Sequence, residues 1–547
     1  MKKITRRNFL KIAGTAAASA SMLAMAGCGS AASASASASA SASASGSSAA
    51  SAAADNYSES DPYHLTFAYI EFYEQDADAR QAVQDAINEK LRPSLHIEVE
   101  LLPLSVSEYQ TNVQLMLSGG DDLDVLPIHY SNAASWINMN GIVDMTPYMD
   151  SDEGKEIETA LGEKLAHAGT MNGILYGFPA NKEYVELGGL CMRADVCDKI
   201  GITEQYGLKL NDDEYKGVIY DWSVAGDIFA KVKAAYPNMD AFYLTSSSQM
   251  NRFTHFDVLS DSFGVIDWDA DNASTTVVNK YETETYHEMA ALLADWYTKG
   301  YIYKDAQTST VAGATQVKAG NTFSYATGIK PGFLVEAKAA SNNDCYVMYF
   351  GRGNKTDSGV RSVLHTSNAN LYNTGIASNS KDPAMAFRFI HALYTDPELM
   401  NLWQYGIQDV NYKLQSDGTA YFVDGQDSSN YTYHQNTGWS MGNQFISYVW
   451  NDGSKTADYW DKLTKHNAWG DYSGTFGFMW DSTEHANELT ALSNALNTYR
   501  AAIETGSVGS AALDSTLEQL NTALYAAGLS TVMKAKQEQL DQWLASK

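Results

Sequence analysis

The chain is poor in cysteine, proline and basic residues. Its 547 residues include 4 Cys and 10 Pro, and 37 Lys and Arg stand against 65 Asp and Glu, a formal net charge of −28. Nucleic acids and anionic lipid surfaces are bound through basic patches, so neither is an expected partner. Beyond the N-terminal region, no apolar run approaches the roughly 20 residues that a membrane span needs. These shortages exclude nucleic-acid-binding proteins and proteins whose body crosses a membrane.

Signatures of catalysis and metal binding are also missing. Gly351–Thr356 begins like a dinucleotide loop but lacks the third glycine, and His287 has no second histidine for a zinc-protease helix. Asp267–Val278 begins like a calcium loop, yet Asn272 and Val278 stand where glycine and glutamate are required. A polar hairpin turn is favoured there. The sequence has no Walker loop, G-x-S-x-G elbow or zinc spacing, so we expect no catalytic residue, metal or cofactor.

The cysteines do not form a disulfide framework. Cys28 lies in the N-terminal region, and Cys191, Cys197 and Cys345 follow much later. Outside the cell a Cys191–Cys197 bridge and buried thiols are both compatible with the sequence. This choice stays open.

Residues 1–27 are typical of an export signal. They contain five cations and no acid, and their run Ile12–Gly27 is apolar or small but too short and too weakly hydrophobic to span a membrane. Thr5–Lys11 resembles the twin-arginine export motif. An ordinary secretory signal with a chance Arg-Arg pair is the alternative.

Met25–Cys28 resembles the bacterial lipobox, whose cysteine becomes the first residue of the mature protein and carries a diacylglycerol. Two acyl chains give stable membrane attachment, whereas one gives marginal attachment. The Ala and Ser side chains of Gly29–Ala54 cannot bury enough apolar area to offset the entropy of ordering, so this tract should stay disordered. We therefore expect Cys28 to be lipidated and residues 28–60 to form a tether on the outer face of the cell membrane.

The first part of the body alternates between strand and helix patterns. In His64–Phe72 the apolar residues Leu65, Phe67 and Tyr69 fall on one face of a strand. The following segments read helix, strand, helix and strand at residues 77–91, 96–104, 108–117 and 124–128. This order is typical of a mostly parallel sheet with helices on its faces. The fold class is therefore α/β.

The later part of the chain is predicted to be rich in helix. Asp382-Pro383 and Asp396-Pro397 each combine an N-cap with proline at the first helical position, and Gly406 closes the second helix. After Thr483, apolar residues at helical spacing mark three further helices. Their marker residues are Leu489, Leu492, Leu496, Tyr499 and Ile503; Leu513, Leu517, Leu520 and Leu524; and Met533, Leu540 and Leu544.

The whole pattern resembles the extracellular solute-binding lipoproteins of bacterial ABC transporters, of the family 1 carbohydrate type with an extended C-terminal domain. The matching segments are residues 71–91, 124–150, 173–196, 277–305, 375–406, 442–445 and 524–547. The resemblance implies a type II periplasmic-binding-protein fold with two hinge-connected lobes. The expected boundaries are residues 61–178 plus 306–374 for the first lobe and 179–305 plus 375–547 for the second.

The resemblance also implies a function. A monomer on the outer face of the membrane would capture a sugar or oligosaccharide between its lobes and deliver it to the transmembrane permease of an ABC transporter, without enzymatic activity. A binding protein for a peptide or another non-sugar nutrient is one alternative. A surface enzyme acting on glycosides is another, because 65 acidic residues guarantee some close carboxylate pairs.

Candidate ligand-binding residues should lie at strand ends or where the chain crosses between lobes. There they would offer a ring face or a hydrogen-bonding group to a sugar. The predicted set is Tyr69, Glu71, Tyr73, His129, Tyr130, Asn132, Asn181, Glu183, Tyr184, Tyr325, Trp439 and Asn443. Trp439, which lies between Gly438 and Gly442, is the predicted stacking platform.

Overall fold

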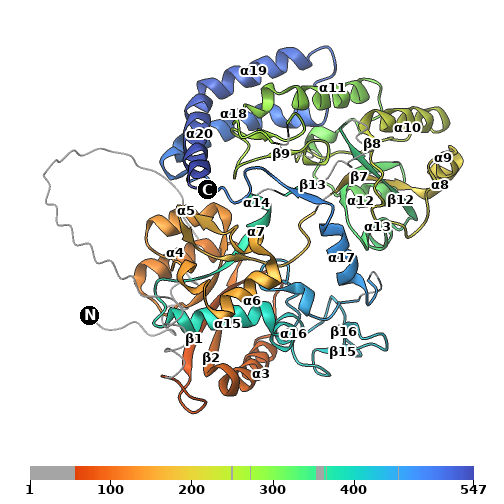
Figure 1. Cartoon of the computed structure of the whole chain (residues 1–547). Helices are drawn as coiled ribbons and strands as arrows, with labels where there is room; N and C mark the ends of the chain where they lie inside the picture. Colours follow the sequence, from red (N-terminus) through yellow and green to blue (C-terminus); the bar gives the residue numbers. More distant parts are fainter. Residues whose placement is uncertain are drawn as a thin grey trace, which may run out of the picture. The chain divides into compact units, whose positions relative to one another are not determined.

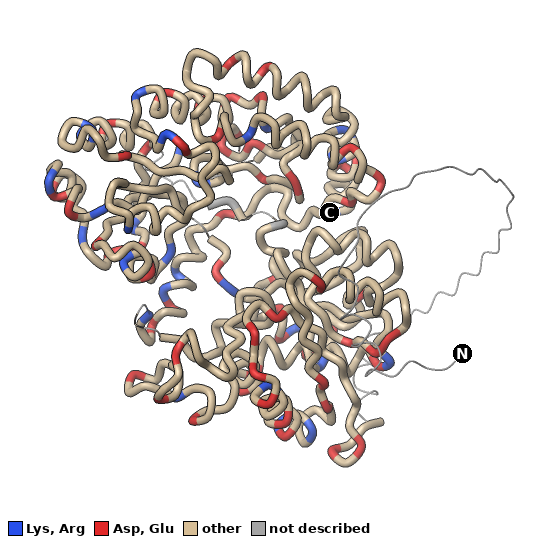
Figure 2. Tube along the Cα trace, turned by 180° about the vertical axis from the view of Figure 1, so that it is seen from behind, with Lys and Arg blue, Asp and Glu red and all other residues tan. Residues whose placement is uncertain are grey.

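The computed structural model describes residues 56–547, apart from positions 186, 248–249, 272, 353–361, 365, 452 and 454. All of them belong to one compact unit, Ser45–Lys547. The expected signal, the Cys28 lipidation site and almost all of the tether lie outside the described residues. Within the described part no helix has the length and apolar character that a membrane span requires. Figure 2 shows Asp and Glu spread along the chain and interspersed with fewer Lys and Arg.

The first lobe is built on a five-stranded sheet (Figure 1). In spatial order its strands are β2 (Ile97–Ser105), β1 (Tyr63–Glu71), β3 (Val125–His129), β14 (Tyr372–Ile376) and β6 (Phe178–Pro179). Strands β1, β2 and β3 are parallel, and β14 runs antiparallel to both of its neighbours. The parallel α/β arrangement expected from the sequence is confirmed for these strands.

The alternation of β1 divides the first lobe into two cores. Leu65, Phe67 and Tyr69 enter one core, and Ala68 and Ile70 enter the other. Helices cover both faces, which is why both sets of side chains are apolar. The first core contains α3 (Ala77–Leu95), α6 (Asp152–Leu161), α15 (Pro383–Thr395) and α16 (Pro397–Tyr405), and the second contains α4 (Tyr109–Gly119) and α5 (Tyr130–Asn138).

Local capping explains where several of these helices begin. The Asp382 carboxylate accepts hydrogen bonds from the backbone N–H groups of the first turn of α15, and Asp396 does the same for α16. Asp76 caps α3 in the same way. Each capping carboxylate satisfies N–H groups that have no partner within the helix. The two Asp-Pro helix starts predicted from the sequence are confirmed.

The second lobe is built on a four-stranded sheet. In order its strands are β11 (Ser324–Ile329), β7 (Leu187–Arg193), β12 (Cys345–Gly351) and β8 (Tyr220–Asp221). One face borders a large core to which the following helices contribute: α8 (Ala194–Lys199), α9 (Ile202–Tyr206), α10 (Trp222–Ala235), α11 (Glu284–Thr298), α18 (Ala486–Glu504), α19 (Leu513–Ala526) and α20 (Leu529–Ala545). The other face packs on α12 (Gly313–Lys318) and α13 (Phe333–Ser341). The three C-terminal helices expected from the leucine pattern are therefore part of this lobe.

Short elements complete the fold. They are α7 (Glu163–Ala166), α14 (Thr366–Ala369), α17 (Tyr459–Asn467), β4 (Thr170–Met171), β5 (Ile174–Leu175), β9 (Phe256–Asp257), β10 (Ile266–Asp267), β13 (Ser362–Leu364), β15 (Tyr412–Leu414), β16 (Ala420–Phe422) and β17 (Gly470–Tyr472). Strands β13 and β17 pair in parallel, although they are far apart in the sequence.

The chain passes between the two sheets three times, and the three passages meet. The first passage joins β6 to β7, the second joins β12 to β14 through β13, and the third includes β17 and leads to α18. Gly470 lies where they meet. A Cβ atom there would come within 2.6 Å of Val185 Cγ2 and 2.9 Å of Leu364 Cδ1, so the absence of a side chain permits the close approach.

The sheet order corrects the lobe boundaries expected from the sequence. Strands β11 and β12 fall in the range 306–374 that was assigned to the first lobe, but they pair with β7 in the second sheet. Helices α15 and α16 fall in the range 375–547 that was assigned to the second lobe, but they pack in the first-lobe core. The apolar pattern of a segment predicts whether it is a strand or a helix. It does not predict which of the two sheets the segment joins, because that depends on pairing between residues far apart in the sequence.

The three described cysteines are buried free thiols. Cys191 lies in the core beneath α12 and α13, whereas Cys197 lies in the core on the other face of the second sheet. The Cys191–Cys197 bridge that the sequence left open is therefore not formed.

Asp124 provides a test of the first lobe. Its buried carboxylate accepts hydrogen bonds from the Tyr63 hydroxyl at 2.5 Å, the Ser380 hydroxyl at 2.5 Å and the Thr66 N–H at 2.8 Å. It thereby connects the entry to β3 with β1 and with the segment before α15.

We expect Asp124→Ala to lower the free energy of unfolding by about 2–4 kcal/mol, because buried donors lose their acceptor. Urea unfolding followed by circular dichroism measures this. Asp122→Ala is the matched control, since its ion pair with Lys381 is exposed and screened by solvent, so its loss should lower the free energy of unfolding far less. Equal losses in the two variants would contradict the role given to Asp124.

Candidate functional site

Five rings gather where the strands of the first sheet end. We call Phe72, His129, Tyr130, Tyr372 and Trp439 the aromatic cluster, and all five are half-buried. The ring centroids of Phe72 and Trp439 are 4.8 Å apart, and those of Tyr372 and Trp439 are 5.9 Å apart. His129 lies 4.5 Å from Tyr130 and 5.2 Å from Tyr372. The cluster thus places five partly exposed rings at one edge of the sheet.

The strand order explains how the cluster forms. The parallel strands β1 and β3 end at neighbouring positions, which places Phe72 and His129 at the carboxyl edge of the sheet. Because β14 runs in the opposite direction, its first residue, Tyr372, pairs with His129. Carboxyl ends of strands are where open α/β sheets bind their ligands.

The cluster contains residues that the sequence predicted and residues that it missed. His129, Tyr130 and Trp439 were predicted and are brought together. Phe72 was missed although it directly follows β1, and Tyr372 was missed because its place depends on the antiparallel pairing of β14. The predicted Tyr73 is next to the cluster in sequence and is 48% exposed.

The cluster is electrically neutral at neutral pH. Burial lowers the pKa of the His129 imidazole, which favours its uncharged form. Burial also raises the pKa of the Tyr372 hydroxyl, and burial followed by the Asp261 carboxylate raises that of Tyr130. Its polar atoms can therefore donate or accept hydrogen bonds without carrying a charge.

Four predicted site residues lie apart from the cluster or inside a core. Tyr69 is fully buried against Phe67 and Trp403, because the alternation of β1 directs it inward. Asn132 is buried in α5. Tyr325 lies in the second-lobe core, where its ring packs closely against Gly313.

The fourth, Glu71, forms an ion pair with Arg80 at 3.1 Å. Burial and then the Arg80 charge act on it in opposite directions, and its pKa is raised.

The other predicted residues lie together where the first passage leaves the first lobe. The Asn181 N–H donates to the Gly442 carbonyl at 2.8 Å, and Asn443 donates through its amide to the Tyr394 carbonyl at 3.2 Å. The buried Tyr184 donates its hydroxyl to the Ala180 carbonyl. These contacts give Asn181, Asn443 and Tyr184 partners within the protein.

Glu183 has two strong partners at the same place. Its carboxylate accepts hydrogen bonds from Lys330 Nζ and from Gln444 Nε2, both at 2.8 Å. Burial opposes its ionisation, but the charges of Lys330 and Lys182 outweigh burial and lower its pKa to about 2. The ionised Glu183 thus links the first passage to the segment after β11, through Lys330, and to the segment after Trp439, through Gln444.

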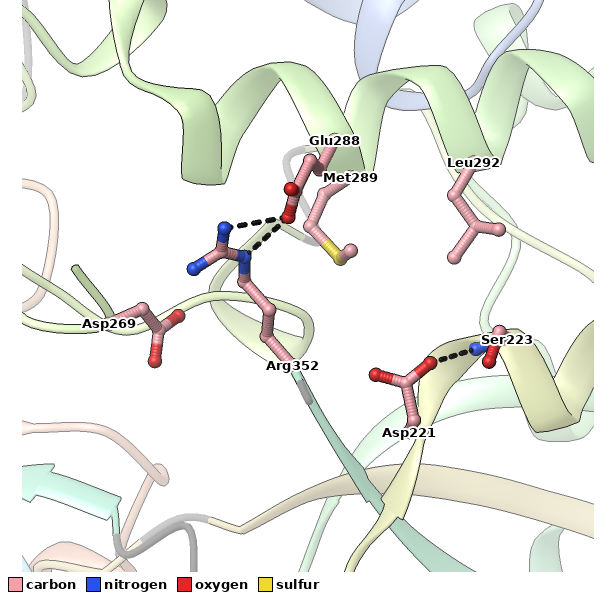
Figure 3. Close-up of a pocket in the computed structure, with 7 residues that line it drawn as sticks. All are labelled: Asp221, Ser223, Asp269, Glu288, Met289, Leu292 and Arg352. Carbon is pink, nitrogen blue, oxygen red and sulfur yellow. Dashed lines mark hydrogen bonds and ion pairs between the residues drawn. The ribbon is translucent and has the colours of Figure 1, made fainter. Parts of the chain in front are cut away.

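A pocket in the second lobe was not predicted from the sequence. It has a volume of about 400 Å³ and lies where β8 and β12 end, beside α10 and α11 (Figure 3). Its lining residues are Asp221, Ser223, Asp269, Glu288, Met289, Leu292 and Arg352. We call it the second-lobe pocket. Like the aromatic cluster, it lies at the carboxyl ends of strands.

Carboxylates dominate the chemistry of the second-lobe pocket. Arg352 binds Glu288 through Nε at 2.7 Å and Nη2 at 2.6 Å (Figure 3). The Asp221 carboxylate accepts the Ser223 N–H at 2.8 Å and so caps α10. Asp269 accepts the His255 N–H at 2.8 Å, with His255 Nδ1 2.9 Å from its other oxygen. The described lining residues thus place three carboxylates and one guanidinium beside the apolar side chains of Met289 and Leu292.

The segment that begins like a calcium loop supplies Asp269. Asp267 accepts a hydrogen bond from the Thr285 hydroxyl at 3.0 Å, and backbone bonds between Val265 and Val278 close the segment. Asn272 lies outside the described residues. Among the residues that the structure does describe, no group of three or more His, Cys, Asp or Glu is placed to hold a metal ion.

A comparison with protein-family models identifies the family. The model described as "Bacterial extracellular solute-binding protein" matches residues 82–410. The chain belongs to this family. A second model, "Domain of unknown function (DUF3502)", matches residues 474–545, which include α18, α19 and α20.

Similar proteins agree with this assignment. A carbohydrate ABC transporter substrate-binding protein of Streptococcus pneumoniae serotype 4 is 23% identical over 471 residues, covering 84% of this chain and 87% of that protein. The crystal structure of the N-glycan transport solute-binding protein NgtS of Streptococcus pneumoniae matches with a TM-score of 0.68 and 20% identity, over 88% of this chain and 99% of that one.

The human-milk-oligosaccharide (HMO)-binding solute-binding protein of Bifidobacterium longum infantis matches with a TM-score of 0.57 and 12% identity, over 88% of this chain and 99% of that one. These structural likenesses show the fold. The two-lobe solute-binding fold expected from the sequence is confirmed.

The hydrogen bonds and ion pair of Glu183 predict how the free energy of unfolding depends on pH. Because the folded-state pKa lies below the unfolded value of about 4.3, its stabilisation is complete above that pH and is lost as the pH falls towards 2. We expect Glu183→Gln to reduce the free energy of unfolding at pH 7 by on the order of 1–2 kcal/mol, after allowing for partial exposure of Lys330.

Urea unfolding between pH 7 and pH 3 checks this. The difference between wild type and variant should narrow below about pH 4.3. Glu74→Gln, at an exposed position, serves as the control and should match the wild type. A difference that stays constant from pH 7 to pH 3 would show that the Glu183 charge does not stabilise the fold.

Proposed function

We propose that this solute-binding protein captures an oligosaccharide and delivers it to the permease of an ABC importer. The observation that carries the proposal is the aromatic cluster. Sugars have apolar C–H faces and rims of hydroxyl groups, and half-buried rings at strand ends match the faces. The carbohydrate and N-glycan transport named for the similar proteins supports the same substrate class.

The second-lobe pocket supports a neutral sugar. Its carboxylates can accept hydrogen bonds from hydroxyl groups, and Met289 and Leu292 offer an apolar wall. Among the described residues that line the pocket, the one cation, Arg352, is already paired with Glu288. The described lining thus has three carboxylates and one guanidinium, which would repel an anionic sugar but not a neutral one.

Calorimetric titration tests the substrate class. The probes are the neutral glycans Man5GlcNAc and fructo-nystose, named as ligands of solved relatives, with a mixture of tripeptides as the comparison. We expect heat of binding from at least one glycan, none from the peptides, and no release of reducing ends during the incubation. Binding of peptides without binding of either glycan, or release of reducing ends, would contradict the proposal.

Trp439→Ala tests the stacking role directly. We expect the affinity for the bound glycan to fall about tenfold or more, while the melting temperature changes little because Trp439 is half-buried at the edge of the lobe. Trp543→Ala is the control: Trp543 is also half-buried but contacts Phe478 and Lys547 within residues 474–547, which we call the C-terminal domain. Unaltered affinity in Trp439→Ala would place the platform elsewhere, and a collapsed melting temperature would make Trp439 a core residue.

We further propose that Cys28 carries the lipid anchor and that the protein acts as a monomer on the outer face of the membrane. The support is the Met25–Cys28 sequence between an apolar run and an Ala/Ser tract. Cys28→Ala should abolish incorporation of a labelled fatty acid in the bacterial cell. Incorporation of label into the alanine variant would contradict the assignment.

A further inference from the structure

One hairpin of the second lobe contributes to the second-lobe pocket. Strands β9 and β10 pair antiparallel, and we call residues 255–269 the pocket hairpin. Its two ends are joined by the contacts between His255 and Asp269, and Asp269 lines the pocket. The position of this carboxylate in the pocket therefore depends on the conformation of the whole hairpin.

The turn of the pocket hairpin has an unusual backbone. Leu259 and Ser260 have φ values of 45° and 81°, in the left-handed region that residues with a side chain rarely adopt. One hydrogen bond within the turn supports this conformation: the Leu259 N–H donates to the Asp257 carboxylate at 3.2 Å. Two consecutive residues in this region persist only when the surrounding structure fixes them.

Contacts with the C-terminal domain hold this turn in place. Lys536 on α20 is fully buried, and its ammonium group donates to the Asp261 carboxylate at 2.8 Å and to the carbonyls of Phe263 and Gly264 at 3.0 and 2.9 Å. An ammonium group has three protons, so these acceptors satisfy it completely. The ring of Trp480, which belongs to the same domain, lies 4.8 Å from the Lys536 nitrogen.

Three further hydrogen bonds join the domain to the hairpin and to the segment that follows it. The Thr475 hydroxyl donates to Asp257 at 2.6 Å. Gln537 accepts the Val277 N–H at 2.7 Å and donates to the Thr275 carbonyl at 3.1 Å. The domain therefore contacts the base of the hairpin, its turn and the returning segment.

We infer that the C-terminal domain positions the pocket hairpin. Lys536 is the positioning residue: it fixes the turn of the hairpin and thereby the place of Asp269 in the second-lobe pocket. Lys536 does not line the pocket and acts through the hairpin. The effect of Lys536 on the affinity for the solute rests on the proposed function, in which the pocket binds the hydroxyl groups of a neutral glycan.

Amide hydrogen exchange on the full chain tests the positioning without any ligand. In Lys536→Met, the amides of residues 257–265 should exchange at least tenfold faster than in the wild type, while those of β1 and α3 in the first lobe stay unchanged. Lys534→Met is the matched control, because Lys534 lies on the same helix and is exposed. Unchanged exchange of residues 257–265 in Lys536→Met would overturn the inference.

Thr475→Val provides a second route if Lys536→Met does not fold. It is nearly the same size, removes the hydroxyl bond to Asp257, and should accelerate exchange of the same residues by a smaller factor. Exchange that rises equally throughout the second lobe would show a general loss of stability and would also overturn the inference.

Titration with Man5GlcNAc then tests the consequence for binding. A positioning role predicts that Lys536→Met raises the dissociation constant about tenfold at a stoichiometry near one. A merely structural role lowers the stoichiometry of active protein with an unchanged dissociation constant, and that result would overturn the positioning role. If the wild type binds neither Man5GlcNAc nor fructo-nystose, the proposed function fails, while the exchange experiment still decides whether the domain positions the hairpin.

Discussion

The antiparallel insertion of β14 between β3 and β6 is the interaction on which the rest of the first lobe depends. The chain builds β1 to β3, leaves for the second sheet, and returns only at Tyr372 to complete the first sheet. Asn373, buried in β14, donates its amide to the Tyr176 hydroxyl at 3.2 Å, which adds a side-chain tie to the strand pairing. This return fixes the passages between the lobes and brings Tyr372 beside His129.

The two candidate regions differ in charge, and the difference follows from their surroundings. Burial keeps the His129 imidazole neutral in the aromatic cluster, whose remaining members are uncharged. In the second-lobe pocket the described lining residues include three carboxylates, one of which, Glu288, pairs with Arg352. Neutral rings suit the C–H faces of a sugar, and carboxylates suit its hydroxyl groups. The combination therefore favours a neutral, hydroxyl-rich solute over an anionic one.

Local sequence patterns were sufficient to predict much of the fold. The alternation of Leu65, Phe67 and Tyr69 predicted a strand with one face in a core, and the Asp-Pro pairs predicted the starts of α15 and α16. The lobe to which a segment belongs could not be predicted in this way. Strands β11 and β12 resemble any other apolar strand, and their pairing with β7 depends on contacts between residues more than 100 positions apart.

The candidate site was predicted only in part for a similar reason. The sequence could indicate His129 and Tyr130 because they lie at the end of a predicted strand. It could indicate Trp439 because this residue lies between two glycines, Gly438 and Gly442. Tyr69 was selected by proximity to a strand end, although the alternation that predicted its strand also directs its ring into the core.

Lys536 shows a second limit of sequence patterns. It lies on the apolar face of its helix, between the predicted positions Met533 and Leu540, where a pattern alone suggests an apolar residue. Its burial is tolerated because three oxygen atoms of the pocket hairpin accept its protons. Such complementarity becomes visible only when both segments are placed in the structure.

A crystal structure of the chain with bound Man5GlcNAc tests the central claim most directly. The account predicts a sugar ring against the face of a residue of the aromatic cluster, with Trp439 as the first candidate. It also predicts hydroxyl groups within hydrogen-bond distance of polar atoms at the carboxyl ends of the strands. A glycan bound on another surface, with the aromatic cluster and the second-lobe pocket both free of sugar, would contradict it.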